Sequence, residues 1–231
     1  SVITHDYRGL AGKRQQSWLF CKIRIELCSR MRYNDKKAAG RYGLFFSRLG
    51  AYTMTYIQHY DAPLGRILLA ADEVGLTGLW FDGAKYFADG LPAEHTERET
   101  PVLSEARRWL DLYFAGREPG FLPPLHPAGS TFQQAVWALL LQIPYGQTVT
   151  YGELARQLAE KQGRPRMSAQ AVGGAVGHNK ISIIIPCHRV VGTGGSLTGY
   201  AGGIDRKVKL LALEQTDMTR FFVPKTGTAL L

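Results

Sequence analysis

One short segment of this chain places a nucleophile beside groups that could activate it. Residues 183–185 are all isoleucine, and Pro186, Cys187, His188 and Arg189 follow them directly. We expect 183–185 to be a buried strand that Pro186 ends, because proline donates no hydrogen bond to a sheet and fixes its backbone. A thiol near an imidazole and a guanidinium lies in a polar, electropositive setting that stabilises a thiolate. The alternative is that Cys187 is a small buried apolar residue.

The order of the residues does not by itself bring the imidazole to the sulfur. Adjacent side chains of an extended chain point to opposite sides, so His188 reaches Cys187 only through a sharp turn or a bridging water. A third group that orients the base would complete the arrangement, and this carboxylate must come from elsewhere in the chain. The segment therefore predicts a thiol, a base and a distant acid.

The cysteine count favours a free thiol. Cys21, Cys28 and Cys187 make an odd, low number, which argues against a secreted disulfide framework and favours a reducing compartment. Cys21 and Cys28 have no clear histidine partner, so we expect no metal, and a metal site at these two cysteines is the alternative. There is no run of about 20 apolar residues for a membrane helix and no secretory signal.

Positive charge is concentrated in the first quarter of the chain. Residues 1–54 hold eleven Lys/Arg and three Asp/Glu, against seventeen and sixteen in the remainder, so +8 of the net +9 lies there. We interpret 1–54 as a basic extension that is disordered or not native, with Met54 as a natural start. The alternative is an arm that adds non-specific phosphate contacts.

The next part of the sequence predicts a small sheet with one helix. Residues 55–60, 65–72 and 76–81 have the pattern of strands separated by turn residues, as in an antiparallel meander. From Pro101 to Phe114 the apolar residues recur at helical spacing. This predicts an N-terminal α/β domain over 55–115, followed by a Gly- and Pro-rich linker over 116–129.

The C-terminal part predicts a helix-turn-helix within a domain over 130–218, with a tail over 219–231. Ser130 with Gln133, and Thr150 with Glu153, are capping-box patterns for helices to about Ile143 and over the 150s. Ser168 can cap a third helix over 169–176. The fold class is therefore α+β, with a winged-helix-like C-terminal domain.

The third helix is rich in small residues, including Ala169, Gly173 and Gly174. Each glycine lowers the stability of a helix interior by about 1 kcal/mol relative to alanine. We therefore expect another surface to approach this helix closely, where side chains would be in the way. A neighbouring helix or a DNA groove would each account for it.

The chain resembles the O6-alkylguanine-DNA alkyltransferases, also called methylated-DNA–protein-cysteine methyltransferases. The resemblance covers the C-terminal unit, where the matching residues have the same spacing as in the family. The unit before the linker looks like the family's variable N-terminal domain. It rests on Ile185-Pro186-Cys187-His188-Arg189-Val190, on Phe132, Trp137, Pro144-Tyr145-Gly146, Thr150-Tyr151-Gly152, Ala171-Val172-Gly173 and Asn179, and on Gly199-Tyr200-Ala201-Gly202-Gly203 and 207–214.

The resemblance implies the roles of the reacting groups. Cys187 would be the alkyl acceptor, and His188 would take the thiol proton through a water. Glu214 would hold and polarise His188. Asn179 would brace the turn that presents the cysteine, and its other interpretation is a helix-stop residue in the left-handed region.

The resemblance also implies a pocket for an extruded guanine. Tyr151 would meet the flipped base, and Tyr200 would pack on it. The backbone of Ala201 would donate toward the guanine oxygen, and the Val190 carbonyl would accept from the exocyclic amine. Lys207 would lie near the leaving oxygen. The alternatives are a core aromatic for Tyr151 and a solvated helix charge for Lys207.

The resemblance implies that the glycine-rich helix would contact DNA, through Ala169, Gln170, Gly173 and Gly174. Many relatives have an arginine where this chain has Gln170, which can hydrogen-bond to the orphaned base but lacks charge and reach. Ala201 replaces a serine of some relatives, so only its backbone contact is expected.

Together these features predict a single-turnover repair protein that flips O6-methylguanine, with O4-methylthymine as an open second substrate, out of double-stranded DNA. It would act as a monomer without cofactor or membrane, in the cytoplasm or, in a eukaryote, the nucleus. The alternatives are a non-catalytic protein that flags alkylated bases, and a cysteine hydrolase using Cys187 and His188, which lacks the expected further His and Asn/Asp.

Overall fold

The computed structural model describes residues 54–225 of the chain. Cys21, Cys28 and all but the last residue of the predicted basic extension lie outside this range, as does the end of the predicted tail. Within the described range, no helix is long and apolar enough to cross a membrane.

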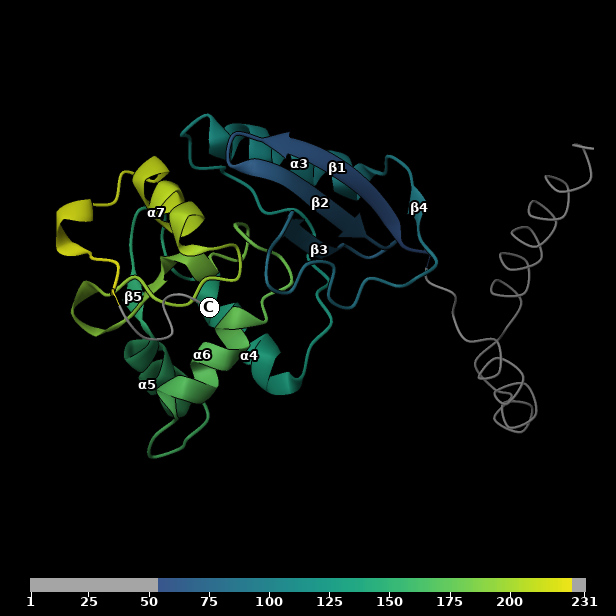
Figure 1. The fold of residues 1–231 in the computed structure, drawn as a ribbon. Helices are drawn as coiled ribbons and strands as arrows, with labels where there is room; N and C mark the ends of the chain where they lie inside the picture. Colours follow the sequence, from purple (N-terminus) through teal and green to yellow (C-terminus); the bar gives the residue numbers. More distant parts are fainter. Residues whose placement is uncertain (1–53, 226–231) are drawn as a thin grey trace, which may run out of the picture. The chain divides into compact units, whose positions relative to one another are not determined.

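The first elements form a four-stranded sheet in the order β3-β2-β1-β4 (Figure 1). Strands β1 (Tyr56–Ala62), β2 (Gly65–Ala71) and β3 (Leu76–Phe81) pair as the predicted antiparallel meander. The prediction missed β4 (Thr96–Glu97), which pairs parallel with β1 and makes the sheet mixed. Two exposed polar residues have no apolar alternation, so the sequence carried no signal for this strand.

Helix α3 (Pro101–Phe114) confirms the predicted helix at both ends. It begins where Thr100 accepts a hydrogen bond from the Leu103 amide, with Pro101 at a position that needs no amide donor. Its apolar face is buried in the main core together with β2 and β3, through Leu103, Ala106, Trp109, Leu110 and Tyr113. The far end of α3 therefore carries an aromatic residue into the interior.

Three helices pack together in the C-terminal part: α4 (Thr131–Leu140), α5 (Tyr151–Lys161) and α6 (Ala169–Gly177) (Figure 1). Both predicted capping boxes are present, at Ser130 and Thr150, and Ser168 caps α6. Helix α4 ends before the predicted Ile143. Its last turn tightens to bonds between residues three apart, because the residue before Pro144 is disfavoured in a helix.

The remaining elements of the described range are two short strands, three 3₁₀ turns and one helix. The two-stranded sheet of β5 (Val149–Thr150) and β6 (Val190–Val191) is parallel, and β6 follows the short 3₁₀ turn η1 (Cys187–Arg189). Then come η2 (Thr193–Gly195), α7 (Ile204–Leu213) and η3 (Met218–Arg220).

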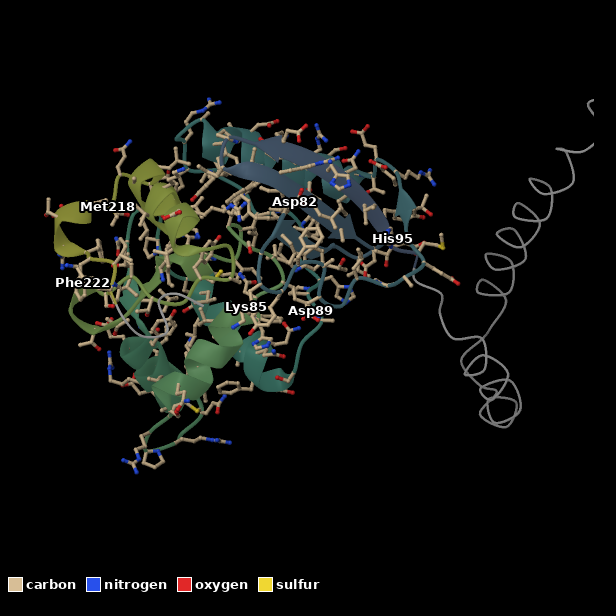
Figure 2. The ribbon with its side chains drawn as sticks, viewed as in Figure 1. Asp82, Lys85, Asp89, His95, Met218 and Phe222 are labelled. Atoms are coloured by element: carbon tan, nitrogen blue, oxygen red, sulfur yellow. The ribbon has the colours of Figure 1, made fainter. Side chains whose placement is uncertain are left out.

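The sheet is joined to the C-terminal part through the edge of β3. The Leu79 amide donates to the Lys180 carbonyl at 2.8 Å, and the Ser182 amide donates back to the Leu79 carbonyl at 3.0 Å. The loop after β3 adds two links, an ion pair between Asp89 and Lys180 and a backbone bond from Lys85 to Ala201 (Figure 2, where Asp89 and Lys85 are labelled). The segment before Cys187 is thus fixed to the sheet.

The predicted linker is also tied to this strand. The Leu76 amide donates to the Pro124 carbonyl at 2.8 Å, and the His126 amide donates to the Leu76 carbonyl at 2.7 Å. The division of the chain into domains at 116–129 stays a prediction.

Candidate active site

Cys187 lies at the start of η1 with its side chain buried, and the residues just before it in the chain form a turn. The expected strand over 183–185 is wrong. The three isoleucines are buried, but Ile183 has a φ of +68°, which a β-branched residue rarely adopts. The chain bonds to itself instead of to a neighbouring strand, with the Ile185 amide donating to the Ile181 carbonyl at 3.1 Å.

Asn179 explains this turn. Its Nδ2 donates to the carbonyls of Ile181 and Ile185 and, at 3.1 Å, to Cys187 Sγ, while its Oδ1 accepts from the Ile181 amide at 3.0 Å. Asn179 is not among the described residues with positive φ, so its interpretation as a left-handed helix stop is wrong. One amide side chain therefore shapes the backbone and touches the sulfur.

Glu214, the distant acid, lies directly behind the histidine. His188 Nε2 is 2.7 Å from Glu214 Oε1, and both side chains are fully buried. Arg189 donates from Nε to Oε2 at 2.8 Å and from Nη2 to Oε1 at 3.0 Å. The Gly146 amide and the Tyr113 hydroxyl complete the set of donors.

These donors keep Glu214 ionised. Burial alone would raise its pKa, but the hydrogen bonds and charges of His188 and Arg189 hold the pKa of Glu214 at about 2. Burial lowers the pKa of His188 more than Glu214 raises it, so the imidazole is neutral at neutral pH. An anionic carboxylate accepts only, so Nε2 carries the imidazole proton and Nδ1 keeps its lone pair. Within the described residues, Nδ1 has no hydrogen-bond partner.

The thiol is held in its neutral form by its surroundings. Burial raises the pKa of Cys187, and the Asn179 hydrogen bond and the Lys207 charge act in the opposite direction. The sulfur therefore needs a base at the moment of reaction, and a free imidazole nitrogen on the next residue is available for that purpose.

Lys207 lies inside the protein, so the interpretation as a solvated charge is wrong. Its Nζ donates to the carbonyls of Val190 at 2.6 Å and Thr198 at 2.7 Å, and its side chain is fully buried. Burial lowers the pKa of Lys207 to about 8. The Val190 carbonyl, predicted to meet a base, thus already accepts one hydrogen bond and keeps a second lone pair.

Two tyrosines border the sulfur from other segments. Tyr151, the first residue of α5, donates from its hydroxyl to the Gly199 carbonyl at 3.1 Å. Tyr200 is buried. Burial raises the pKa of both phenols, and the negative charge that Cys187 carries once it has lost its proton raises the pKa of both further. Ala201 follows in a turn where its carbonyl accepts from the Lys85 amide at 2.9 Å.

Helix α6 presents a different kind of surface. Ala169, Gln170 and Gly174 are exposed, and a Cβ added to Gly174 would meet nothing within 4 Å. A Cβ on Gly173 would be in ordinary contact with the Tyr151 ring at 3.6 Å. Packing within the protein therefore gives no reason for Gly174, and the helix leads directly to Asn179.

Sequence reasoning missed the contributions of Tyr113, Arg189 and Gly146 to this site. Tyr113 looked like a core residue of an amphipathic helix, and it is one, but its hydroxyl donates to Glu214. The sequence shows Arg189 only as a charge close to Cys187. In the part of the chain that the structure describes, no cluster of three or more His, Cys, Asp or Glu residues could hold a metal ion.

Comparisons with known proteins match both parts of the chain. The model of the 6-O-methylguanine DNA methyltransferase ribonuclease-like domain matches residues 55–127, and that of its DNA binding domain matches 131–216. Relatives named methylated-DNA–protein-cysteine methyltransferase include one from Haemophilus influenzae, 42% identical over 71% of this chain and 88% of its own length. Another from Methanosarcina acetivorans is 46% identical over 69% of this chain and 97% of its own. A crystal structure of Mycobacterium tuberculosis OGT in complex with DNA is 41% identical, has a TM-score of 0.60, and covers 72% of this chain and 94% of that one.

Proposed function

Because this chain belongs to the 6-O-methylguanine DNA methyltransferase family, we propose that it repairs DNA by moving an alkyl group from O6 of guanine to the sulfur of Cys187. The observation that carries the proposal is a thiol that Asn179 holds in place, on the residue before a neutral imidazole that has a buried carboxylate behind it.

The reaction balances within the site. The thiol proton of Cys187 passes to His188 Nδ1 through a water, and the sulfur forms a bond to the alkyl carbon as the carbon–O6 bond breaks. The electrons of the broken bond go to the guanine, and the proton that His188 took from the thiol passes to the guanine. The third N–H of Lys207, beyond the two that meet carbonyls, stabilises the charge on the departing oxygen. A thioether has no easy hydrolysis route, so each molecule acts once.

The target base must leave the duplex to reach this site. Cys187 is only 4% exposed, so the segment that covers the sulfur must also move when the base enters. The Tyr151 hydroxyl donates to the Gly199 carbonyl, and we infer that the rings of Tyr151 and Tyr200 contact the purine once it has entered. On the protein surface, the exposed side of α6 would lie against the DNA, with Gln170 toward the unpaired partner base.

We place the protein where DNA is, in the cytoplasm or, in a eukaryote, the nucleus, and we infer that it acts as a monomer on double-stranded DNA without a cofactor. The same assay, with O4-methylthymine in place of the methylated guanine, tests whether this base is a second substrate.

The test is mass spectrometry after incubation with an oligonucleotide duplex that contains O6-methylguanine. We expect the mass of a single methyl in place of one hydrogen, located on Cys187, and at most one per molecule. The matched control is the double variant Cys21→Ser and Cys28→Ser, which changes the other two cysteines and should still react.

Two outcomes would contradict the proposal. Methyl transfer that persists in Cys187→Ser would place the acceptor elsewhere. Tight lesion binding by the unmodified protein without any mass gain would favour the non-catalytic role, and repeated turnover of a simple ester would favour a hydrolase.

A further inference from the structure

A buried tyrosine from the sheet-and-helix part of the chain reaches the carboxylate of the site. The Tyr113 hydroxyl, at the end of α3, donates to Glu214 Oε1 at 2.7 Å and lies 3.4 Å from His188 Nε2. The side chain is fully buried, stacked on Trp109 with ring centroids 5.2 Å apart. The phenol therefore has a fixed orientation, and 101 residues separate it from its acceptor.

The direction of this hydrogen bond is determined by charge. Burial and the negative charge of Glu214 raise the pKa of Tyr113 well above its ordinary value, so the hydroxyl keeps its proton. That proton points to Glu214, which accepts only. The same Oε1 then accepts from Tyr113, from His188 and from Arg189. An oxygen shared among three donors attracts each proton less strongly than it would attract one alone.

We propose that Tyr113 is a positioning residue for the transfer reaction: its hydroxyl fixes the Glu214 carboxylate against His188 and moderates its pull on the Nε2 proton. His188 then stays neutral at neutral pH, with Nδ1 free to accept the thiol proton. This inference rests on the proposed function of Cys187 and extends the reacting group to α3.

The neighbours of His188 provide few other ways to set its proton affinity. Glu214 on the α7 side favours the imidazolium, while Arg189 in the same turn and Lys207 of α7 oppose it. The Tyr200 ring packs edge-on against the His188 ring, with the ring centroids 6.4 Å apart, and Cys187 directly precedes His188 in the chain. Of these groups, Glu214 is the one that Tyr113 touches directly.

The variant Tyr113→Phe removes one oxygen atom and keeps the ring. We expect single-turnover methyl transfer near neutral pH to slow by about ten-fold, the order of one hydrogen bond to a charged group. The rate should rise with pH as His188 loses its proton. In Tyr113→Phe this rise should move to higher pH by about one unit, because Glu214 now holds the imidazolium more tightly.

The matched control is Tyr60→Phe. The Tyr60 hydroxyl donates to Asp111 at 2.8 Å, so the same atom is deleted from the same kind of bond, at an exposed carboxylate away from Glu214. Its rate and pH profile should equal those of the unmodified protein. A Tyr113→Phe profile that is slower but unshifted, or shifted to lower pH, would reduce Tyr113 to a packing residue and overturn the proposal.

A second measurement needs no DNA, and its first part needs only the unmodified protein. Nitrogen-15 NMR of labelled histidine should report His188 as the Nε2–H tautomer in the unmodified protein, and a raised pKa of His188 in Tyr113→Phe. An Nδ1–H tautomer would overturn the proposal. If the unmodified protein transfers no methyl group while these NMR results hold, the proposed function fails and the coupling of Tyr113 to His188 stands.

Discussion

A fully buried lysine is unusual because a charged ammonium loses most of its hydration. Lys207 compensates with two short hydrogen bonds to carbonyls, one of them on Val190. The remaining cost is visible in its pKa of about 8, lowered by burial and partly restored by the nearby Cys187. At neutral pH the side chain is therefore mostly protonated, and at pH 9 it is mostly neutral.

This pKa predicts a falling limb in the rate of methyl transfer. Because the protonated lysine stabilises the departing oxygen, the single-turnover rate should decrease as pH rises through about 8. Lys207→Met should be slower at neutral pH and lack this limb. Lys209→Met, at an exposed position of the same helix, is the control and should keep both the rate and the limb. A limb at the same pH in Lys207→Met would assign it to another group.

Among the elements, α6 contains glycines that its own packing does not require. Gly174 is exposed in the helix interior with open space around it, where alanine would be the more stable residue. The absence of a side chain is then useful only to a partner that approaches the helix from outside.

Gly174→Ala should therefore separate stability from DNA binding. We expect the free energy of unfolding to increase by about 0.5–1 kcal/mol, from helix propensity alone. The affinity for duplex DNA should decrease, because the new methyl group lies where the DNA backbone must approach. Denaturant unfolding and a DNA titration measure the two effects, and alkylation of Cys187 by iodoacetamide checks that the site is intact. Unchanged affinity would remove α6 from the DNA interface.

Local signals predicted most of the helices and strands. The predicted capping residues Ser130, Thr150 and Ser168 stand where side-chain bonds to the backbone start helices, and these interactions involve only neighbours in sequence. The turn at 183–185 was missed because three isoleucines favour a strand, and only the distant side chain of Asn179 overrides that preference.

The site was predictable only in part, for the same physical reason. Cys187 and His188 are adjacent and form a readable motif, and Glu214 was expected through the resemblance and lies beside His188. A buried tyrosine whose ring packs in a core gives no sign that its hydroxyl serves a carboxylate far along the chain. Tyr113 was therefore visible in sequence as packing alone.

At the scale of the whole molecule, Glu214 is a junction between distant segments. It accepts from Tyr113 of α3, from Gly146 before β5, and from His188 and Arg189 of η1. Its folded-state pKa is about 2, against an ordinary value of 4.5. A carboxylate with a lowered folded pKa contributes stability that is complete above its unfolded pKa and lost as pH falls through its folded pKa.

Acid should therefore destabilise the protein through this residue between about pH 4.5 and 2. The shift corresponds to a contribution on the order of 3 kcal/mol at neutral pH. Glu214→Gln should be less stable at pH 7 and should show a weaker dependence on pH across that window, measured by urea unfolding at each pH. Glu94→Gln, at an exposed position, is the control and should leave both the stability and its pH dependence unchanged. An equal pH slope in Glu214→Gln would assign the acid sensitivity to other carboxylates.

Glu214 follows Cys187 in the sequence, and this order also governs when the thiol can become reactive. A growing polypeptide leaves the ribosome from its N-terminus, so Cys187 emerges before the acid that must stand behind its histidine. Until that acid is added and docked, the sulfur behaves as an ordinary cysteine of an incomplete chain. Transfer of the alkyl group to Cys187 therefore has to wait until residue 214 has been added and has docked against His188.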